Sequence, residues 1–332
     1  ALIGNPNQFA LTALQPGTIV NAGNLAVEPG QSITLLGGTV INTGTLTAPG
    51  GTVTIAAVPG GKLVRINQAG SLLSLDLPTE TRAVLNPATV TPVSLPALLT
   101  GGNLGNATGL TVQDGAVKLT GSGVTIPTEA GVAIASNQID VSGTTGGTVN
   151  VLGNKVGVVS ATIHAAGTNG GGTVLIGGDY KGQGTVPNAQ QTYVSRDSVI
   201  NVDALQSGNG GRAIVWADNS TRFYGTINAR GGAQSGNGGF VEVSGKQNLM
   251  FDGGVDVQAP AGAAGQLLLD PASVVIGTDG TNDNEFNLAN VNPANDDREI
   301  LASDAGGTFF ISVDRLVQAL RRGDVTIAAG VD

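Results

Sequence analysis

The chain has 332 residues, of which 40% are hydrophobic, only 3% are aromatic and 53 are glycine. An ordinary globular domain carries more large side chains, whereas the narrow interior of a stacked-coil protein is filled by Val, Ile, Leu and Ala. With 15 Lys and Arg against 24 Asp and Glu, the net charge is −9 and no basic run occurs, so a nucleic-acid-binding protein is not predicted.

Two other classes are excluded by what the sequence lacks. It has no cysteine, so disulfides, thiolate metal sites and thiol nucleophiles are excluded, as suits export of an unfolded chain. No apolar run approaches the roughly 20 residues of a membrane span. The opening residues ALIGNPNQFA show no charged region followed by an apolar one, so any signal peptide is expected upstream or already removed.

The first predicted unit, residues 1–66, consists of short strands separated by glycines. Coils are expected from Gly17 to Ala57, where Val40 and the pair Val53 and Ile55 follow double glycines. The next unit, residues 67–110, holds four prolines among many leucines, and proline is excluded from central strands. We interpret it as a loop-rich insertion on the flank, with a short helical turn near PALLTGG.

Residues 111–278 are predicted to be the main coils, because one unit recurs there. A double glycine, or Ala-Gly in the last case, precedes two apolar residues with one residue between them. The glycines are 147, 172, 211, 239 and 265, and the pairs are Val149/Val151, Val174/Ile176, Ala213/Val215, Val241/Val243 and Leu267/Leu269. Such alternation is the period of a strand with one buried face.

A second alternating strand recurs with the same period. Its apolar pairs are Ile139/Val141, Ile163/Ala165, Ile200/Val202, Ile227/Ala229 and Val255/Val257, with Asp140, His164, Asn201, Asn228 and Asp256 between them. Both series have one long interval, which is explained by an insertion of about ten residues in YKGQGTVPNAQQTYVSRDS, and periods of this size are typical of solenoids.

These repeats predict an all-β fold, a right-handed parallel β-helix. One coil cannot bury its own apolar stripe, but stacked coils bury Val on Val in continuous columns, and parallel crossovers are right-handed. We expect the glycines to turn the corners through positive φ angles. Val243 and Val257 should then point inward, while Glu242 and Gln258 face water.

The last unit, residues 279–332, begins with a polar, turn-rich excursion. It continues with a short helix over 313–322, indicated by apolar residues at helical spacing, a Ser312 cap, Asp314 in the first turn and Arg321 and Arg322 in the last. The sequence DVTIAAG then predicts a strand of a further coil, so the stack is expected to continue past Asp332.

A family resemblance now becomes specific. Stretches such as NAGNLAVEPGQSITLLGGTVINTGTLTAPGGTVTI, LLTGGNLGNATGLTVQDGAVKLTGSG and GNGGFVEVSGKQNLMFDGGVDVQAPAGAAGQLLLDP resemble the filamentous-haemagglutinin-like exoproteins of two-partner secretion, over almost the whole chain. The resemblance implies a long β-helix, secretion through an outer-membrane transporter and a role in adhesion. The family's secretion domain, with its NPNG-type motif, should lie upstream; GNPNQFAL is at best its tail, so no secretion-signal residues are assigned.

The residues that could support catalysis all have an ordinary surface role as well. His164, the only histidine, occupies the slot that Asp140 and Asp256 fill in other coils, so a surface position is favoured over a catalytic base. Asp140, Glu242 and Asp256 would suit the acid–base chemistry of a polysaccharide lyase or hydrolase. They recur one per coil, however, as solvated faces do, and no aromatic sugar platform stands beside them. No catalytic residue set is therefore predicted.

The sequence also contains groups that could bind a ligand. Asp279, Asp283 and Glu285 offer oxygen ligands for calcium, but their spacing misses the EF-hand pattern, so a polar turn is favoured. Trp216 and Tyr224 are expected to point outward, as partner anchors or as single exposed aromatics. GTNGGGTVLIGGD lacks the Lys-Ser/Thr ending of a phosphate loop. No metal or cofactor is predicted.

The sequence thus favours a non-catalytic, adhesin-like shaft that is secreted and associated with the cell surface. Its expected partners are the outer-membrane transporter and surface glycans or proteins of host or neighbouring cells. One alternative is a structural subunit of an extracellular filament or matrix, built by head-to-tail stacking of exposed end coils. The other is a β-helical polysaccharide lyase or hydrolase.

Overall fold

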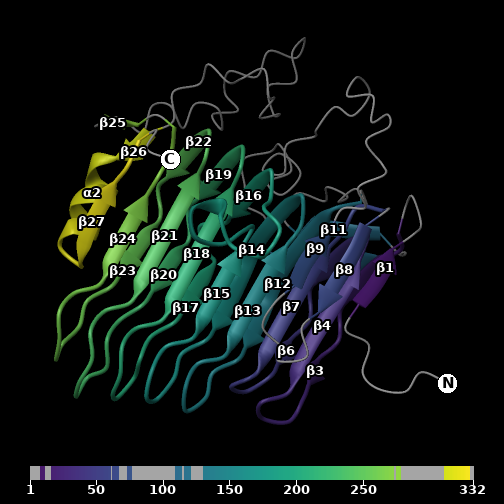
Figure 1. The fold of residues 1–332 in the computed structure, drawn as a ribbon, viewed down its shortest axis with the longest axis horizontal. Helices are drawn as coiled ribbons and strands as arrows, with labels where there is room; N and C mark the ends of the chain where they lie inside the picture. Colours follow the sequence, from purple (N-terminus) through teal and green to yellow (C-terminus); the bar gives the residue numbers. More distant parts are fainter. Residues whose placement is uncertain are drawn as a thin grey trace.

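A computed structural model describes residues 8–11, 16–60, 62–66, 73–76, 109–113, 116–120, 130–272, 274–277 and 310–329 of the chain. Its strands stack coil upon coil along the longest axis, from β3 and β4 at one end to α2 and β27 at the other (Figure 1). Within these coils the strand pairs are parallel, which confirms the predicted parallel β-helix.

The first stack is an eight-stranded sheet and holds the strands that follow the double glycines. In stacking order it consists of β4 (Ser32–Gly37), β7 (Thr52–Ala57), β13 (Thr148–Leu152), β15 (Thr173–Ile176), β18 (Arg212–Ala217), β21 (Phe240–Gly245), β24 (Gln266–Leu269) and β27 (Asp324–Ile327). Its register places Val149 beside Val174, Val215 beside Val243 and Val241 beside Leu267, as the repeat predicts.

The second predicted strand series forms another stack, which we call the third stack because its strand comes last in each coil. It runs through β3 (Leu25–Ala26), β6 (Leu46–Thr47), the second halves of β12 (Val132–Asp140) and β14 (Lys155–His164), β17 (Val199–Asn201), β20 (Thr226–Asn228) and β23 (Gly254–Asp256). Ile163, Ile200 and Ile227 lie in register in one buried column.

Between these two stacks, each coil has one further strand that the sequence repeat did not predict. This second stack comprises β2 (Thr18–Asn21), β5 (Thr39–Asn42), the first halves of β12 and β14, β16 (Gln191–Val194), β19 (Ser220–Phe223), β22 (Asn248–Phe251) and β26 (Phe310–Ser312). Its inward pairs mix threonine with apolar residues, as in Thr192/Val194 and Thr221/Phe223, which obscures the period. Val40 belongs here, beside Ala133, and not in the post-glycine strand.

The three stacks enclose one continuous core of small and branched side chains. Val151, Val243 and Ile163 are fully buried, Val257 is 2% exposed, and Phe223 stacks on Phe251 with ring centroids 5.6 Å apart. Burying apolar surface in this way is the main stabilising contribution to such a fold. The inward positions predicted from alternation are therefore confirmed.

The double glycines have a different physical cause from the one expected. The glycines directly before the five repeated pairs, at 147, 172, 211, 239 and 265, do not have positive φ angles, whereas Gly50 of the earlier pair Gly50/Gly51 has a φ of 62°. A Cβ placed on Gly211 would lie 2.2 Å from the carbonyl oxygen of Gly172, and one on Gly239 would lie 2.1 Å from that of Gly211. Successive coils approach so closely at this corner that no side chain fits between their backbones, which is why glycine recurs there.

A long insertion separates two coils that are neighbours in space. Residues on β5 and β7 pair directly with β12 and β13, although β7 ends at Ala57 and β12 begins at Val132. The expected insertion is thus longer than residues 67–110. Within it, β8 (Lys62–Ile66) pairs antiparallel with β1 (Gln8–Leu11) and β9 (Leu73–Asp76), outside the coils expected up to residue 66.

The stretch expected to resume the coils at residue 111 forms an antiparallel hairpin instead. Its strands are β10 (Gly109–Gln113) and β11 (Ala116–Thr120), which among the described strands pair only with each other. Local alternation fits a hairpin and a coil strand equally well, because both have period two. The expected turn near PALLTGG lies outside the described residues.

In the C-terminal coil, a helix takes the position of the strand in the third stack. After β25 (Val275–Gly277) and β26, α2 (Val313–Leu320) packs against β23, and β27 then joins the first stack beside β24. The predicted helix and strand are confirmed, with Ser312 at the N-cap position but no side-chain capping bond, and with the helix ending before Arg321. Among the described residues no helix is long and apolar enough to cross a membrane.

Candidate functional site

The column that contains His164 and two of the candidate carboxylates lies where the strands of the third stack end. Asp140, His164, Asn201, Asn228 and Asp256 are in register on consecutive coils, and all are partly exposed. The predicted alignment is therefore confirmed. What these residues do is decided by the turn that follows each strand.

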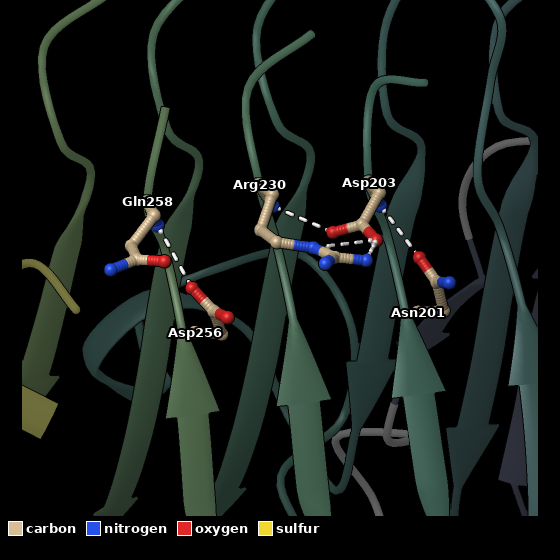
Figure 2. Close-up of polar contacts among 5 residues, drawn as sticks. All are labelled: Asn201, Asp203, Arg230, Asp256 and Gln258. Carbon is tan, nitrogen blue, oxygen red and sulfur yellow. Dashed lines mark hydrogen bonds and ion pairs between the residues drawn. The ribbon is translucent and has the colours of Figure 1, made fainter. Parts of the chain in front are cut away.

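Most of the polar residues in this column cap their own turn. The Asp140 Oδ1 atom accepts a hydrogen bond from the Ser142 N–H at 2.9 Å. Asn201 accepts one from the Asp203 N–H at 2.9 Å, and Asp256 one from the Gln258 N–H at 3.1 Å (Figure 2). An Asx side chain that bonds the backbone two residues on is a turn-forming device, so one Asp or Asn per coil follows from turn chemistry.

The coil that contains Asn228 departs from this pattern through a buried carboxylate. The N–H of Arg230 donates to Asp203 Oδ1 on the preceding coil at 2.7 Å, and its guanidinium donates to Asp203 Oδ2 at 2.6 and 3.1 Å (Figure 2). The Asp203 side chain is 2% exposed. Its carboxylate raises the pKa of Arg230, and this ion pair ties one coil to the next.

The second polar cluster lies on the outer face of the first stack, beneath a chain excursion. We call residues 178–190 the flap; they connect β15 to β16 and include the 3₁₀ turn η1 (Tyr180–Gly182). The flap contains most of the insertion predicted from the long repeat interval. Val186 of the flap packs on Leu175, Ile214 and Trp216, which form a second hydrophobic cluster outside the core.

Glu242 is fully buried in this region, so the expectation that it faces water is wrong. It does point outward from β21, but Ile214 and Leu268 flank it in register and the flap lies over it. The Lys181 N–H lies 3.2 Å from each of its carboxylate oxygens. Burial raises the pKa of Glu242 to about 7, although hydrogen bonds from Lys181 and Ser244 oppose the shift.

Charged residues around Glu242 are paired with one another. The Lys181 Nζ atom lies 3.3 Å from Asp270 Oδ2, and this carboxylate raises the pKa of Lys181. The Arg212 guanidinium lies 2.5 Å from Asp179 Oδ1. A carboxyl group that titrates near neutral pH has the acidity of a general acid or base, but with the flap in place Glu242 cannot reach a substrate.

The outward aromatic residues are covered more than predicted. Trp216 is 3% exposed, because the flap crosses it; its Nε1–H donates to Asp218 Oδ1 at 3.0 Å. Tyr224 is partly exposed, and the guanidinium of Arg196 lies 5.7 Å from its ring centroid. Alternation gives the direction of a side chain, but it cannot show that a distant loop lies over it.

A shallow groove of about 710 Å³ follows the glycine corner, beside the turns that lead into β18, β21 and β24. Arg212, Phe240 and Gln266 line it, and Tyr180 of the flap contacts the Phe240 ring edge-on at 5.7 Å. The backbone N–H groups of Gly171, Gly210 and Gly238 donate to carbonyls of the next coil. They are therefore not free to pair with an added peptide strand.

The predicted candidate residues do not converge on one site. Asp140, His164 and Asp256 lie at the corner after the third stack, whereas Glu242, Lys181 and Asp270 meet on the outer face of the first stack. Among the described residues no group of three or more His, Cys, Asp or Glu side chains could hold a metal ion. Asp279, Asp283 and Glu285 lie outside the described residues.

Comparison with known proteins gives little further identification. No protein-family model and no curated protein matches the chain. A solved structure, the HMW1 secretion domain from Haemophilus influenzae, is similar at 22% sequence identity and a TM-score of 0.35, over 77% of this chain and 69% of that one. At this TM-score the similarity carries no argument about function.

Proposed function

We propose that the coils form the non-catalytic shaft of a secreted surface exoprotein. The observation that carries this proposal is the register of the first stack, in which every strand from β4 to β27 pairs with the next and the inward residues form unbroken columns. Such nearest-neighbour stacking makes a stiff, quasi-one-dimensional body. Eight strands at about 4.8 Å per step correspond to a rod segment about 34 Å long.

The use of the polar residues supports a mechanical role. Asp140 and Asp256 are engaged in turn capping, and Asp203 is paired with Arg230. Glu242 is buried under the flap. A glycoside hydrolase needs two carboxyl groups that face a common open site, and the described carboxylates have no such arrangement.

Export and surface association enter the proposal through the sequence resemblance to two-partner-secretion exoproteins. On this basis the partners are an outer-membrane transporter and surface glycans or proteins on a neighbouring or host cell. The shaft would hold other parts of the exoprotein away from the secreting cell. Its own task then requires length and rigidity, and no catalytic group.

The experiment that tests this proposal combines imaging with an activity screen. Mass measurement and negative-stain imaging of the secreted protein should give monomeric rods, and a panel of polysaccharides should not be cleaved. Sustained cleavage that is abolished by Asp256→Asn or Glu242→Gln would contradict the non-catalytic role. Globular particles in place of rods would contradict the shaft.

A second candidate function, a subunit of an extracellular filament, is favoured by one feature of the last coil. Within the described residues β27 is the edge strand of the first stack, and the neighbouring α2 leaves Val317 and Leu320 41% and 56% exposed. An unpaired strand edge next to apolar side chains can template the addition of another chain. Long polymers of constant width, lost on Leu320→Lys, would favour the filament over the monomeric rod.

A further inference from the structure

The flap is a separate piece of chain pinned at its base. It leaves β15 through Gly177, whose φ of 73° favours glycine, and it returns where the Ala189 N–H donates to the Gly177 carbonyl at 2.6 Å. Beyond this base, the flap is held on the sheet by Val186 in the outer hydrophobic cluster and by Lys181, which reaches both Glu242 and Asp270. Three further contacts are Asp179 with Arg212, Asn188 with Asp218 and Tyr180 with Phe240. All of these contacts lie outside the coils, so the loop can open without unfolding them.

Glu242 is the anchor whose charge state matters most. Its own strand contributes Ser244, β18 contributes Arg212, the position after β24 contributes Asp270, and the flap contributes Lys181. Both cations are already occupied, Lys181 by Asp270 and Arg212 by Asp179. The Lys181 contact with Glu242 is made by a backbone N–H, so ionised Glu242 has no cation of its own while it is buried.

We propose that the flap is a pH-dependent cover, which stays closed over Glu242 while this carboxyl group is protonated and opens when it ionises. Opening lets water reach the carboxylate and uncovers the outer hydrophobic cluster around Trp216. The inference rests on the contacts of the flap and on the burial of Glu242 beneath it. It is independent of whether the coils form a shaft or a filament.

The direction of the pH dependence follows from the two states of Glu242. In the closed state its pKa is raised to about 7, whereas an open, hydrated carboxyl group has the ordinary value of 4.5. Between these pH values the closed state holds a proton that the open state has lost, so closure weakens as pH rises. The opening constant should increase by up to about tenfold per pH unit in this interval and level off above pH 7.

Hydrogen exchange of the intact protein from pH 5 to 9, corrected for intrinsic exchange rates, tests this proposal. Protection of the flap peptide should fall with pH to a plateau near 7, while peptides from β20 and β23 keep their protection. Glu242→Gln, which has the same shape but cannot ionise, should keep the flap protected at every pH. Trp216, the only tryptophan, provides a second readout, because its quenching by acrylamide should follow flap opening.

The matched control is His164→Asn, because His164 is the only histidine and Asn fills the equivalent slot in two later coils. This variant should retain the full response of the flap. Wild-type protection that does not change with pH, or a response that persists in Glu242→Gln, would overturn the proposal. If Glu242→Gln does not fold, His164→Asn still tests the proposal. Loss of the pH response in His164→Asn would overturn the proposal, and retention of the response would support it.

Discussion

At the residue scale, alternation decides which side chains enter the core. Val243 and Val257 point inward and are almost completely buried, whereas Gln258 is exposed. The outward direction of Glu242 also agrees with alternation, but its burial does not, since the flap covers it. Period two therefore predicts the inner face of a coil reliably, and it predicts the outer face only where no other segment lies over it.

The first prediction concerns the inner columns. Val243→Asp and Val257→Asp should each destabilise the protein by several kcal/mol or prevent folding, because the buried carboxylate has no partner. Gln258→Thr is the control and should change the free energy of unfolding by no more than about 0.5 kcal/mol. Chemical denaturation midpoints measure both effects. Equal sensitivity at all three positions would contradict the inward assignment.

The second prediction concerns the close approach of coils at the glycine corner. Gly239→Ala places a Cβ 2.1 Å from the backbone oxygen of Gly211, so it should cost about 3 kcal/mol or more. Gly254→Ala is matched, because its new Cβ would meet only the Thr226 side chain at 3.7 Å. That variant should melt at the wild-type temperature or slightly above it. Similar melting temperatures for both variants would show that the coils can move apart.

At the element scale, each turn after the third stack is stabilised locally by an Asx side chain or by its neighbouring coil. The Asp203–Arg230 pair is the inter-coil version, with a buried carboxylate and a half-exposed guanidinium. Its energetic contribution depends on the carboxylate, since removal of the cation leaves that charge without its strongest partner.

The third prediction tests this pair. Arg230→Met should cost about 2 kcal/mol, because Asp203 loses two charge-assisted hydrogen bonds and keeps only the backbone N–H of residue 230. The double variant Asp203→Asn/Arg230→Met should recover part of this loss, which urea denaturation in a double-mutant cycle will measure. Arg322→Ala, an exposed arginine on the last coil, is the control and should have no measurable effect.

At the scale of the whole molecule, the described strands of a coil pair only with strands of the adjacent coils, so removing one coil should leave the remaining strand pairing intact. The flap is an exception, because its Lys181 reaches Glu242 two coils further on. Gly239 and Gly265 occupy equivalent corners, and Phe240 lies in register with Gln266. An internal deletion of residues 240–265 therefore joins two equivalent points of the stack.

The fourth prediction is that this deletion variant folds and is shorter by one step of about 4.8 Å. Its circular dichroism should remain that of a β protein, and its small-angle scattering should show a shorter rod of the same cross-section. A second deletion of equal length starts six residues later, at 246, and also joins equivalent points of the stack. It should therefore fold as well as the first deletion. Equivalent coils predict that both deletions fold, and collapse of both would contradict the solenoid interpretation.

The repeat, the parallel stacking, the inward columns of two strands per coil and helix α2 could all be predicted from the sequence, because period, spacing and capping are local patterns. It did not reveal the second stack, whose inward threonines hide the period, or the hairpin of β10 and β11, whose alternation equals that of a coil. The burial of Trp216 and Glu242 under the flap could not be predicted, because the contact between the flap and Glu242 joins residues about sixty positions apart. The candidate pH response therefore depends on a long-range contact that no local pattern encodes.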